Sequence, residues 1–289
     1  MTLARLTAVA SITAIGGFFA CGGTTATPPS NSSSAANPVA TAPRASAATP
    51  ETKSSAEKPV ADLGGSKAPS GLDPAKLHGT VENAGAGQQE TFPSGLVIDV
   101  KVVGGPAPGP ELPSGTRVLH VGDSFAGALG VELNKVFNGA GLKGRLEYET
   151  STYIPTWAHS PKLPKLLRKF EPDLVLISLG ANELEIPEPE KRGPLIQRLV
   201  KSLGDTPCVW VAPVLWDGAK STLLDVIRAN VGNCIYLDSN ELVKKMPRAG
   251  DKIHPSMAAR PDWAVATARW LAYHRKPTQS KAWNIDSAR

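Results

Sequence analysis

The sequence predicts an α/β fold, a three-layer α/β/α sandwich built around a five-stranded parallel sheet. Five short runs rich in apolar and β-branched residues follow one another after residue 112. Segments with apolar residues at helical spacing separate these runs. All six tryptophans, which are core-building side chains, lie after residue 150. Strands that alternate with helices are typical of a parallel sheet that is covered on both faces.

The order of the elements follows from these patterns. The predicted strands are Arg117–Val121, Arg145–Glu149, Asp173–Ser178, Cys208–Ala212 and Cys234–Asp238. The predicted helices are Ala126–Asn138, Lys162–Phe170, Gly193–Leu203, Lys220–Asn230 and Asp262–His274. Leu96–Val103 also alternates and is a candidate edge strand, so residues 92–111 are assigned to an edge strand and a loop ahead of a folded domain at 112–289.

The N-terminal part has the features of an export signal and a tether. Residues 1–20 carry Arg5 followed by an apolar stretch that is too short for a transmembrane helix, which is typical of a signal peptide. The stretch FFAC, ending at Cys21, resembles a bacterial lipobox with Phe where Leu is usual, and it predicts lipidation of Cys21. A plain secreted form is the alternative.

Residues 21–91 are expected to form a disordered linker after the lipidated cysteine. No aromatic residue occurs from Gly22 to Thr91, and Ser, Ala, Pro, Thr and Gly dominate. The protein is therefore expected in a bacterial cell envelope, anchored by lipid to a membrane and facing the periplasm or the exterior. The net charge of +5 is mild and no basic run is concentrated, so nucleic acid is not an expected partner.

A strand-to-helix junction carries the first chemical motif. Residues 118–130 read VLHVGDSFAGALG, so an apolar strand ends at Gly-Asp-Ser and a helical pattern follows. Ser124 is thereby placed at a helix N-terminus on the carboxyl edge of the sheet, where ligands bind in open α/β folds. Simple capping of the helix by Asp123 or Ser124 is the alternative.

Two further motifs follow in chain order. LISLGANE at 176–183 leaves the third predicted strand through Asn182, and DKIHPS at 251–256 sets Asp251 three residues before His254. The GDS, GxN and DxxHP motifs resemble those of the SGNH hydrolase family, also called GDSL esterases. The resemblance implies a flavodoxin-like strand order and a serine esterase that needs no metal or organic cofactor.

The resemblance assigns a role to each motif residue, and the chemistry of the residues agrees. Ser124 is the implied nucleophile, His254 the base that takes its proton, and Asp251 the group that orients the imidazole. The Asn182 side chain and the Ser124 backbone N–H are implied donors to the oxyanion of a tetrahedral intermediate.

Two positions depart from the family pattern. The family's further oxyanion donor is a glycine in the loop after the second strand, but this loop reads ETSTYIPTWAHS, and Thr152 or Tyr153 is expected to take its place. The third motif ends in Glu183, where the family commonly has Asp. A backbone N–H survives the first replacement, although a side chain is added at the site.

Two tryptophans are candidates for substrate binding. Trp157 and Trp216 both follow predicted strands, where aromatic rings at the mouth of a pocket would suit sugar stacking; core packing is the alternative. No histidine–cysteine cluster has the spacing of a metal site, and no glycine-rich phosphate loop occurs, so neither metal nor cofactor is expected.

The remaining cysteines are expected to form a disulfide. Cys208 and Cys234 stand at the start of the fourth and fifth predicted strands. These strands are neighbours in a flavodoxin-like order, and parallel pairing brings their beginnings to one edge, with strands about 4.8 Å apart. Two buried free thiols are the alternative.

The expected function is an extracytoplasmic ester hydrolase that removes O-acetyl groups from carbohydrate through an acyl-Ser124 intermediate. The expected partner is an acylated small molecule or polysaccharide. Two alternatives remain open, namely an O-acetyltransferase acting on an envelope polysaccharide and a catalytically inactive glycan-binding lipoprotein.

Overall fold

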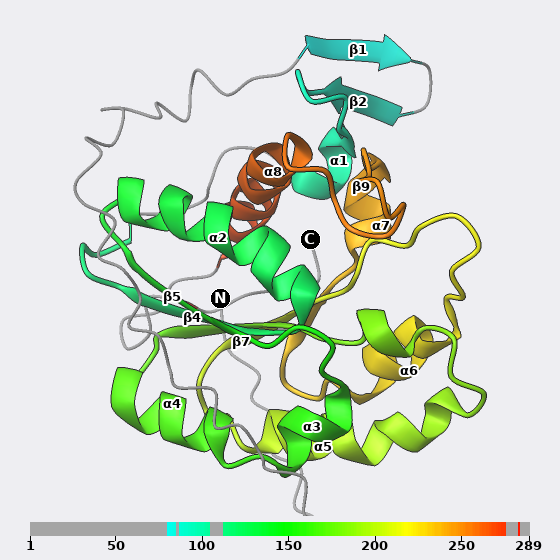
Figure 1. Ribbon diagram of the computed structural model, residues 1–289. Coiled ribbons are helices and arrows are strands. Elements are labelled where there is room, and N and C mark those ends of the chain that lie inside the picture. Colours follow the sequence, from blue (N-terminus) through cyan, green and yellow to red (C-terminus); the bar gives the residue numbers. More distant parts are fainter. Residues whose placement is uncertain (1–79, 85–86, 105–111, 276–282, 284–289) are drawn as a thin grey trace, which may run out of the picture. The chain divides into compact units, whose positions relative to one another are not determined.

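The computed structural model describes residues 80–84, 87–104, 112–275 and 283 (Figure 1). The predicted signal peptide, Cys21 and the predicted linker up to residue 79 lie outside the described residues. Among the helices of the described ranges, none is long and apolar enough to cross a membrane.

The centre of the fold is a five-stranded parallel sheet, as predicted. Its strands are β4 (Arg117–Gly122), β5 (Lys143–Tyr148), β6 (Leu174–Ser178), β7 (Cys208–Val211) and β8 (Ile235–Leu237). They lie in the order β5-β4-β6-β7-β8, which is the flavodoxin-like order. All four pairings are parallel, so every strand ends at the same edge of the sheet.

Two layers of helices cover the sheet (Figure 1). One layer contains α2 (Ser124–Gly139) and α8 (Ala259–Tyr273). The other contains α3 (Ile154–His159), α4 (Lys162–Phe170), α5 (Gly193–Lys201) and α6 (Thr222–Asn230). Successive residues of β6 alternate between the two cores, since Leu176 packs with the α2 layer and Ile177 with the α5 layer. Burial on both faces explains why the strand sequences are continuously apolar.

A second, antiparallel sheet corrects the prediction for residues 92–111 and for the end of the linker. It contains β1 (Thr80–Ala84), β2 (Gly87–Thr91), β3 (Val97–Asp99) and β9 (Val243–Lys245), in that order. The candidate edge strand Leu96–Val103 is thus a short strand of this sheet followed by a helix, α1 (Val100–Val103), whose first turn is capped by Asp99. The sequence could not show this because the partner strand β9 comes from a distant part of the chain.

The second sheet is tied to the sandwich by an ion pair. Glu90 of β2 is 1% exposed and accepts a hydrogen bond from Arg269 of α8 at 2.7 Å. Three short elements complete the described fold: η2 (Ala181–Glu183), η3 (Pro189–Arg192) and α7 (Ser239–Leu242). Strand β9 leads directly into the segment that carries Asp251 and His254.

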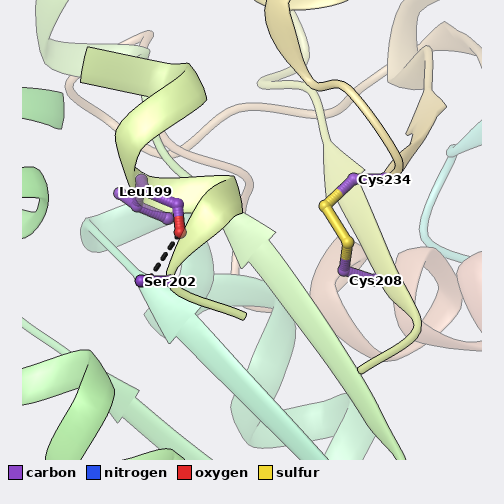
Figure 2. The surroundings of a disulfide bond; sticks show 4 residues. All are labelled: Leu199, Ser202, Cys208 and Cys234. Carbon is purple, nitrogen blue, oxygen red and sulfur yellow. Dashed lines mark hydrogen bonds between the residues drawn. A yellow bond between two sulfur atoms is a disulfide. The ribbon is translucent and has the colours of Figure 1, made fainter. Parts of the chain in front are cut away.

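Cys208 and Cys234 are joined by a disulfide, as the strand order predicts (Figure 2). Cys208 is the first residue of β7, and Cys234 directly precedes β8. Their Cα atoms are 4.7 Å apart. The bond lies at the beginnings of the strands, near the end of α5, where the Ser202 hydroxyl donates to the Leu199 carbonyl at 2.6 Å (Figure 2). Ser124 lies at the opposite edge of the sheet.

Reduction of this disulfide is expected to lower the melting temperature by about 10 °C without changing the activity of the folded protein. The bond closes a loop of about 27 residues, which is worth about 3–4 kcal/mol in the chain-entropy model. Calorimetry with and without reductant measures the shift, and a Cys208→Ser/Cys234→Ser variant should not respond to reductant. Two free thiols per chain in unreduced Cys21→Ser protein would contradict the pairing.

Candidate active site

Ser124 lies at the junction of β4 and α2. Gly122 has a φ of +155°, and a Cβ there would lie 1.9 Å from the Ser178 carbonyl oxygen, so only glycine fits this turn. Asp123 caps the helix, because its Oδ1 accepts the Phe125 N–H at 2.9 Å. Burial raises the pKa of Asp123 to about 6, although the Phe125 N–H lowers it. Since Asp123 is the cap, the Ser124 hydroxyl is left for another partner.

That partner is His254. The Nε2 atom of His254 lies 2.8 Å from Ser124 Oγ, and its Nδ1 lies 2.7 Å from Asp251 Oδ2. The other oxygen of Asp251 accepts the backbone N–H groups of Ile253 and His254, both at 2.9 Å. The hydrogen bonds from the His254 side chain and from these two N–H groups lower the pKa of Asp251 to about 2.

The ionised Asp251 fixes the tautomer of His254. A carboxylate only accepts hydrogen bonds, so the proton of the neutral imidazole must be on Nδ1. The lone pair of Nε2 then faces the Ser124 hydroxyl, which donates to it. The arrangement can accept a proton from Ser124 and hold the resulting imidazolium against a negative charge.

Asn182 and Thr152 meet beside this group of residues. The Nδ2 of Asn182, in η2, donates to the Thr152 carbonyl at 2.9 Å. An amide nitrogen carries two hydrogens, so one N–H orients the side chain and the second remains for a ligand. The Ser124 N–H belongs to the first turn of α2, whose N–H groups have no acceptor within the helix. The site can therefore offer several N–H donors to a negatively charged oxygen.

Trp157 does not line the mouth of the site, and this prediction is wrong. The Trp157 side chain is 3% exposed and belongs to the core beneath α3. Its indole N–H donates to Thr152 Oγ1 at 3.1 Å, so it supports the loop from inside. Trp216 is half-buried, and its ring centroid lies 6.1 Å from that of Phe125, which in turn lies 5.5 Å from that of His254.

Glu183 connects two loops of the site. It is completely buried, its Oε2 accepts the Ile154 N–H at 2.6 Å, and its Oε1 pairs with Arg192. Ile154 starts α3 directly after the segment with Thr152. The carboxylate thus fixes the start of α3 relative to η2, which carries Asn182. Glu183, which departs from the family's Asp, makes both of these contacts here.

Arg248 is a residue of the site region that sequence reasoning missed. Its guanidinium donates to the Ile253 carbonyl at 2.7 Å and to the carbonyls of Val214 and Leu215 at 3.0 and 2.6 Å. It therefore joins the segment that carries His254 to the loop that carries Trp216. No local signal could have found it, because the three carbonyls come together only in the fold.

The described residues include no cluster of three or more histidine, cysteine or acidic side chains that could hold a metal ion. A cavity of about 360 Å³ lies between the α3–α4 connection and α5. Its lining residues are Trp157, Ala158, His159, Ser160, Pro161, Pro164, Arg198, Leu199 and Ser202. Neither Ser124 nor His254 contributes to it, so this cavity is separate from the site.

No protein-family model matches the chain, and no curated protein matches it. Several solved structures do match. TesA is 21% identical, the match covers 54% of this chain and 97% of that chain, and the TM-score is 0.44. The catalytic domain of peptidoglycan O-acetyltransferase A from Streptococcus pneumoniae is 19% identical, with 55% and 93% covered and a TM-score of 0.41. A protein described as a GDSL-like lipase from Parabacteroides merdae is 15% identical, with 56% and 97% covered and a TM-score of 0.39.

At these identities the likeness concerns the fold. The solved structures that match this chain include proteins described as an esterase, a GDSL-like lipase, an O-acetyltransferase and an acetylxylan esterase.

Proposed function

We propose that this protein is a serine ester hydrolase that removes short acyl groups, above all O-acetyl groups, from carbohydrate. The observation that carries the proposal is the continuous chain of contacts from Ser124 Oγ to His254 Nε2 and from His254 Nδ1 to Asp251. Three groups from two distant segments meet with hydrogen-bonding distances and with the tautomer that nucleophilic catalysis requires.

In the first half of the reaction, Ser124 Oγ attacks the ester carbonyl carbon while its proton passes to His254 Nε2. The carbonyl oxygen becomes negatively charged and accepts the N–H groups of Ser124 and Asn182, with the Thr152 N–H as a third donor. The imidazolium of His254 is stabilised by Asp251. His254 then gives its proton to the leaving alcohol, the C–O bond of the ester breaks, and an acyl-Ser124 ester remains.

In the second half, a water molecule takes the position of the alcohol. His254 Nε2 accepts a proton from the water as its oxygen attacks the acyl carbon. The same N–H donors stabilise the second tetrahedral intermediate. The collapse of this intermediate returns the proton to Ser124 Oγ and releases the carboxylic acid. Apart from the ester and this water molecule, no co-reactant is needed to balance either half.

An open site favours a bulky alcohol component. The Asp251 side chain is 48% exposed and the His254 side chain 32% exposed, and Asn182 is exposed as well. A carbohydrate chain can approach such a site without entering a tunnel. The exported, lipid-anchored location that the sequence predicts from Cys21 would bring the site to envelope polysaccharides.

The decisive experiment is hydrolysis of p-nitrophenyl acetate by the purified protein, followed by acetate release from chemically acetylated oligosaccharides. We expect turnover of both. Added acceptor sugars should not divert the acetyl group, whereas diversion would indicate the O-acetyltransferase alternative. No turnover of any ester, with retained binding to a glycan, would favour the inactive glycan-binding alternative.

The membrane anchor is tested separately. The lipobox resemblance at Cys21 predicts that the native protein partitions into the detergent phase of a cell extract. A Cys21→Ser variant should move to the aqueous phase and keep its esterase activity. Native protein in the aqueous phase would contradict lipidation and leave the catalytic proposal unchanged.

Replacement of Arg248 by methionine is expected to lower kcat for p-nitrophenyl acetate by about 10–100-fold, because a small displacement of a reacting group is costly. Without its three hydrogen bonds, the segment with His254 loses its attachment to the neighbouring loop. KM should change much less than kcat. Arg117→Met, which removes an ion pair with Glu171 at the beginning of β4 and thus at the opposite edge of the sheet, serves as the matched control. An equal loss in both variants would contradict a positioning role.

A further inference from the structure

Exposed hydrophobic side chains are concentrated near the candidate active site. The large hydrophobic side chains that are exposed in the described residues are Val131, Tyr148, Tyr153, Ile253 and Met257. Only Val131, in the middle of α2, lies outside the segments that carry or adjoin the site. Apolar groups that gather at one exposed place mark an interaction surface. Their position beside Ser124 points to a substrate rather than to a separate partner.

Tyr148 lies against the first turn of α2. It is the last residue of β5, it pairs in register with Gly122, and it is 43% exposed. A Cβ on Gly127 would lie 2.5 Å from Tyr148 Cε2, so the ring packs directly on this backbone. Gly127 is one turn along the helix from Ser124, so the ring lies on the turn of α2 that Ser124 begins.

Tyr153 lies at the other end of the same loop. It follows Thr152, whose carbonyl accepts the hydrogen bond from Asn182, and it is 45% exposed. Its backbone forms the start of α3, so the ring is attached to a fixed element. Between the two tyrosines, the chain exposes the polar side chains of Glu149 and Ser151.

A second pair of exposed side chains lies on the segment that carries His254. Ile253 precedes His254 and is 36% exposed, and Met257 follows three residues later and is 70% exposed. Lys252, also exposed, lies beside them. Exposed apolar and polar groups thus occur together on both segments.

We propose that Tyr148 and Tyr153 form an aromatic subsite for the sugar rings of an extended, O-acetylated glycan chain, with Ile253 and Met257 along its path. The inference rests on the proposed function for the position of the acetyl group at Ser124. A pyranose has one apolar C–H face and a rim of hydroxyl groups. Tyrosine rings can stack on the apolar face, and the side chains of Glu149, Ser151 and Lys252 can form hydrogen bonds with the hydroxyl groups of the rim.

A lipid surface fits these observations less well. Insertion into a bilayer interface uses a continuous apolar face, as on an amphipathic helix. Here the tyrosines are separated by Glu149, Thr150 and Ser151, all of them exposed. The proposed subsite also replaces Trp157, which is buried, as the aromatic contact for sugar.

Binding is tested in a Ser124→Ala protein, so that the ligand is not consumed. The probes are chemically O-acetylated xylohexaose and the corresponding acetylated chitohexaose, titrated by calorimetry. Tyr148→Leu and Tyr153→Leu should each weaken binding of at least one probe about fivefold, the usual size of one aromatic contact. Tyr148→Phe and Tyr153→Phe should bind within about twofold of the parent. Val131→Ala, at an equally exposed site on α2, should have no effect.

A second measurement separates this inference from the proposed function. In the protein with Ser124 intact, the Tyr148→Leu/Tyr153→Leu variant should lose more kcat/KM for acetate release from the acetylated hexasaccharides than for p-nitrophenyl acetate, because only the glycan chain is long enough to contact both tyrosines. Absence of p-nitrophenyl acetate hydrolysis in the parent would refute the proposed function alone. Tyrosine-dependent glycan binding would still support the subsite.

Two results would overturn the inference. One is unchanged affinity of the double variant for both acetylated hexasaccharides. The other is tyrosine-dependent binding to phosphatidylglycerol vesicles without tyrosine-dependent glycan binding, which would assign the surface to a membrane. Melting temperatures of all variants show whether folding is retained. If Tyr148→Leu unfolds through its contact with α2, Tyr153→Leu alone decides.

Discussion

Ester hydrolysis by a Ser124→Ala variant is expected to be slower than that of the parent protein by about a thousandfold or more, and His254→Ala should cost a similar factor. Ser124 Oγ and His254 Nε2 are 2.8 Å apart and act on the same proton. Without the hydroxyl no acyl-enzyme forms, and without the imidazole the hydroxyl keeps its proton. Each single replacement therefore removes the whole covalent route, so the double variant should be no slower than either single variant.

The measurement is kcat/KM for p-nitrophenyl acetate, together with labelling by an aryl phosphonate. The parent protein should take up one phosphonate at Ser124, and Ser124→Ala should take up none. Ser202→Ala is the matched control, because this exposed serine lies at the far end of the strands near the disulfide. Parent-like rates in a folded Ser124→Ala protein would end the catalytic assignment.

Asn182→Ala is expected to lower kcat by about 100–1,000-fold, the usual loss when one oxyanion donor is removed. One N–H of its amide is held by the Thr152 carbonyl at 2.9 Å, which aims the other N–H. Negative charge develops on the carbonyl oxygen only in the transition state, so the loss should appear in kcat more than in KM.

Single-turnover kinetics with p-nitrophenyl acetate should show slower acylation in Asn182→Ala. Asn233→Ala, an exposed asparagine beside the disulfide, is the control and should be unaffected. A loss confined to KM would mean that Asn182 binds the ground state rather than the oxyanion. No loss at all would leave only backbone N–H groups in this role.

Glu183 departs from the family motif, and its contacts in the structure show what this residue does. From the sequence it is only a glutamate where the family commonly has aspartate. In the structure, its buried carboxylate is paired with Arg192 and hydrogen-bonded to the Ile154 N–H, so its charge is compensated. The replacement therefore does not leave an unpaired charge in the core.

Local patterns determined most of the parallel sheet and its helices. The apolar runs predicted all five strands to within two residues at each end, since a strand buried on both faces must be apolar throughout. Helix α4 was predicted with its observed bounds, 162–170. The sequence pattern predicts no helix in the loop after β5, although α3 occupies residues 154–159 of it with proline in its first turn.

Local patterns could not predict the pairing of strands that lie far apart in the chain. Residues 80–91 lack the aromatic and apolar density of a core, and yet they form two strands because the ladder continues through β3 to β9. Trp157 follows a strand, as a pocket residue would, but the short helix α3 turns it into the core.

The sequence by itself determined the fold class, the strand order through its resemblance, the cysteine pair and the choice of Ser124, Asn182, Asp251 and His254 as candidate site residues. These depend on residue type and on local spacing, which a chain displays directly. Only the tertiary structure decided that Arg248 joins two loops, that Glu183 is paired, and that Tyr148 and Tyr153 are exposed whereas Trp157 is buried. Burial and carbonyl contacts arise from segments far apart in the chain, so no local pattern can encode them.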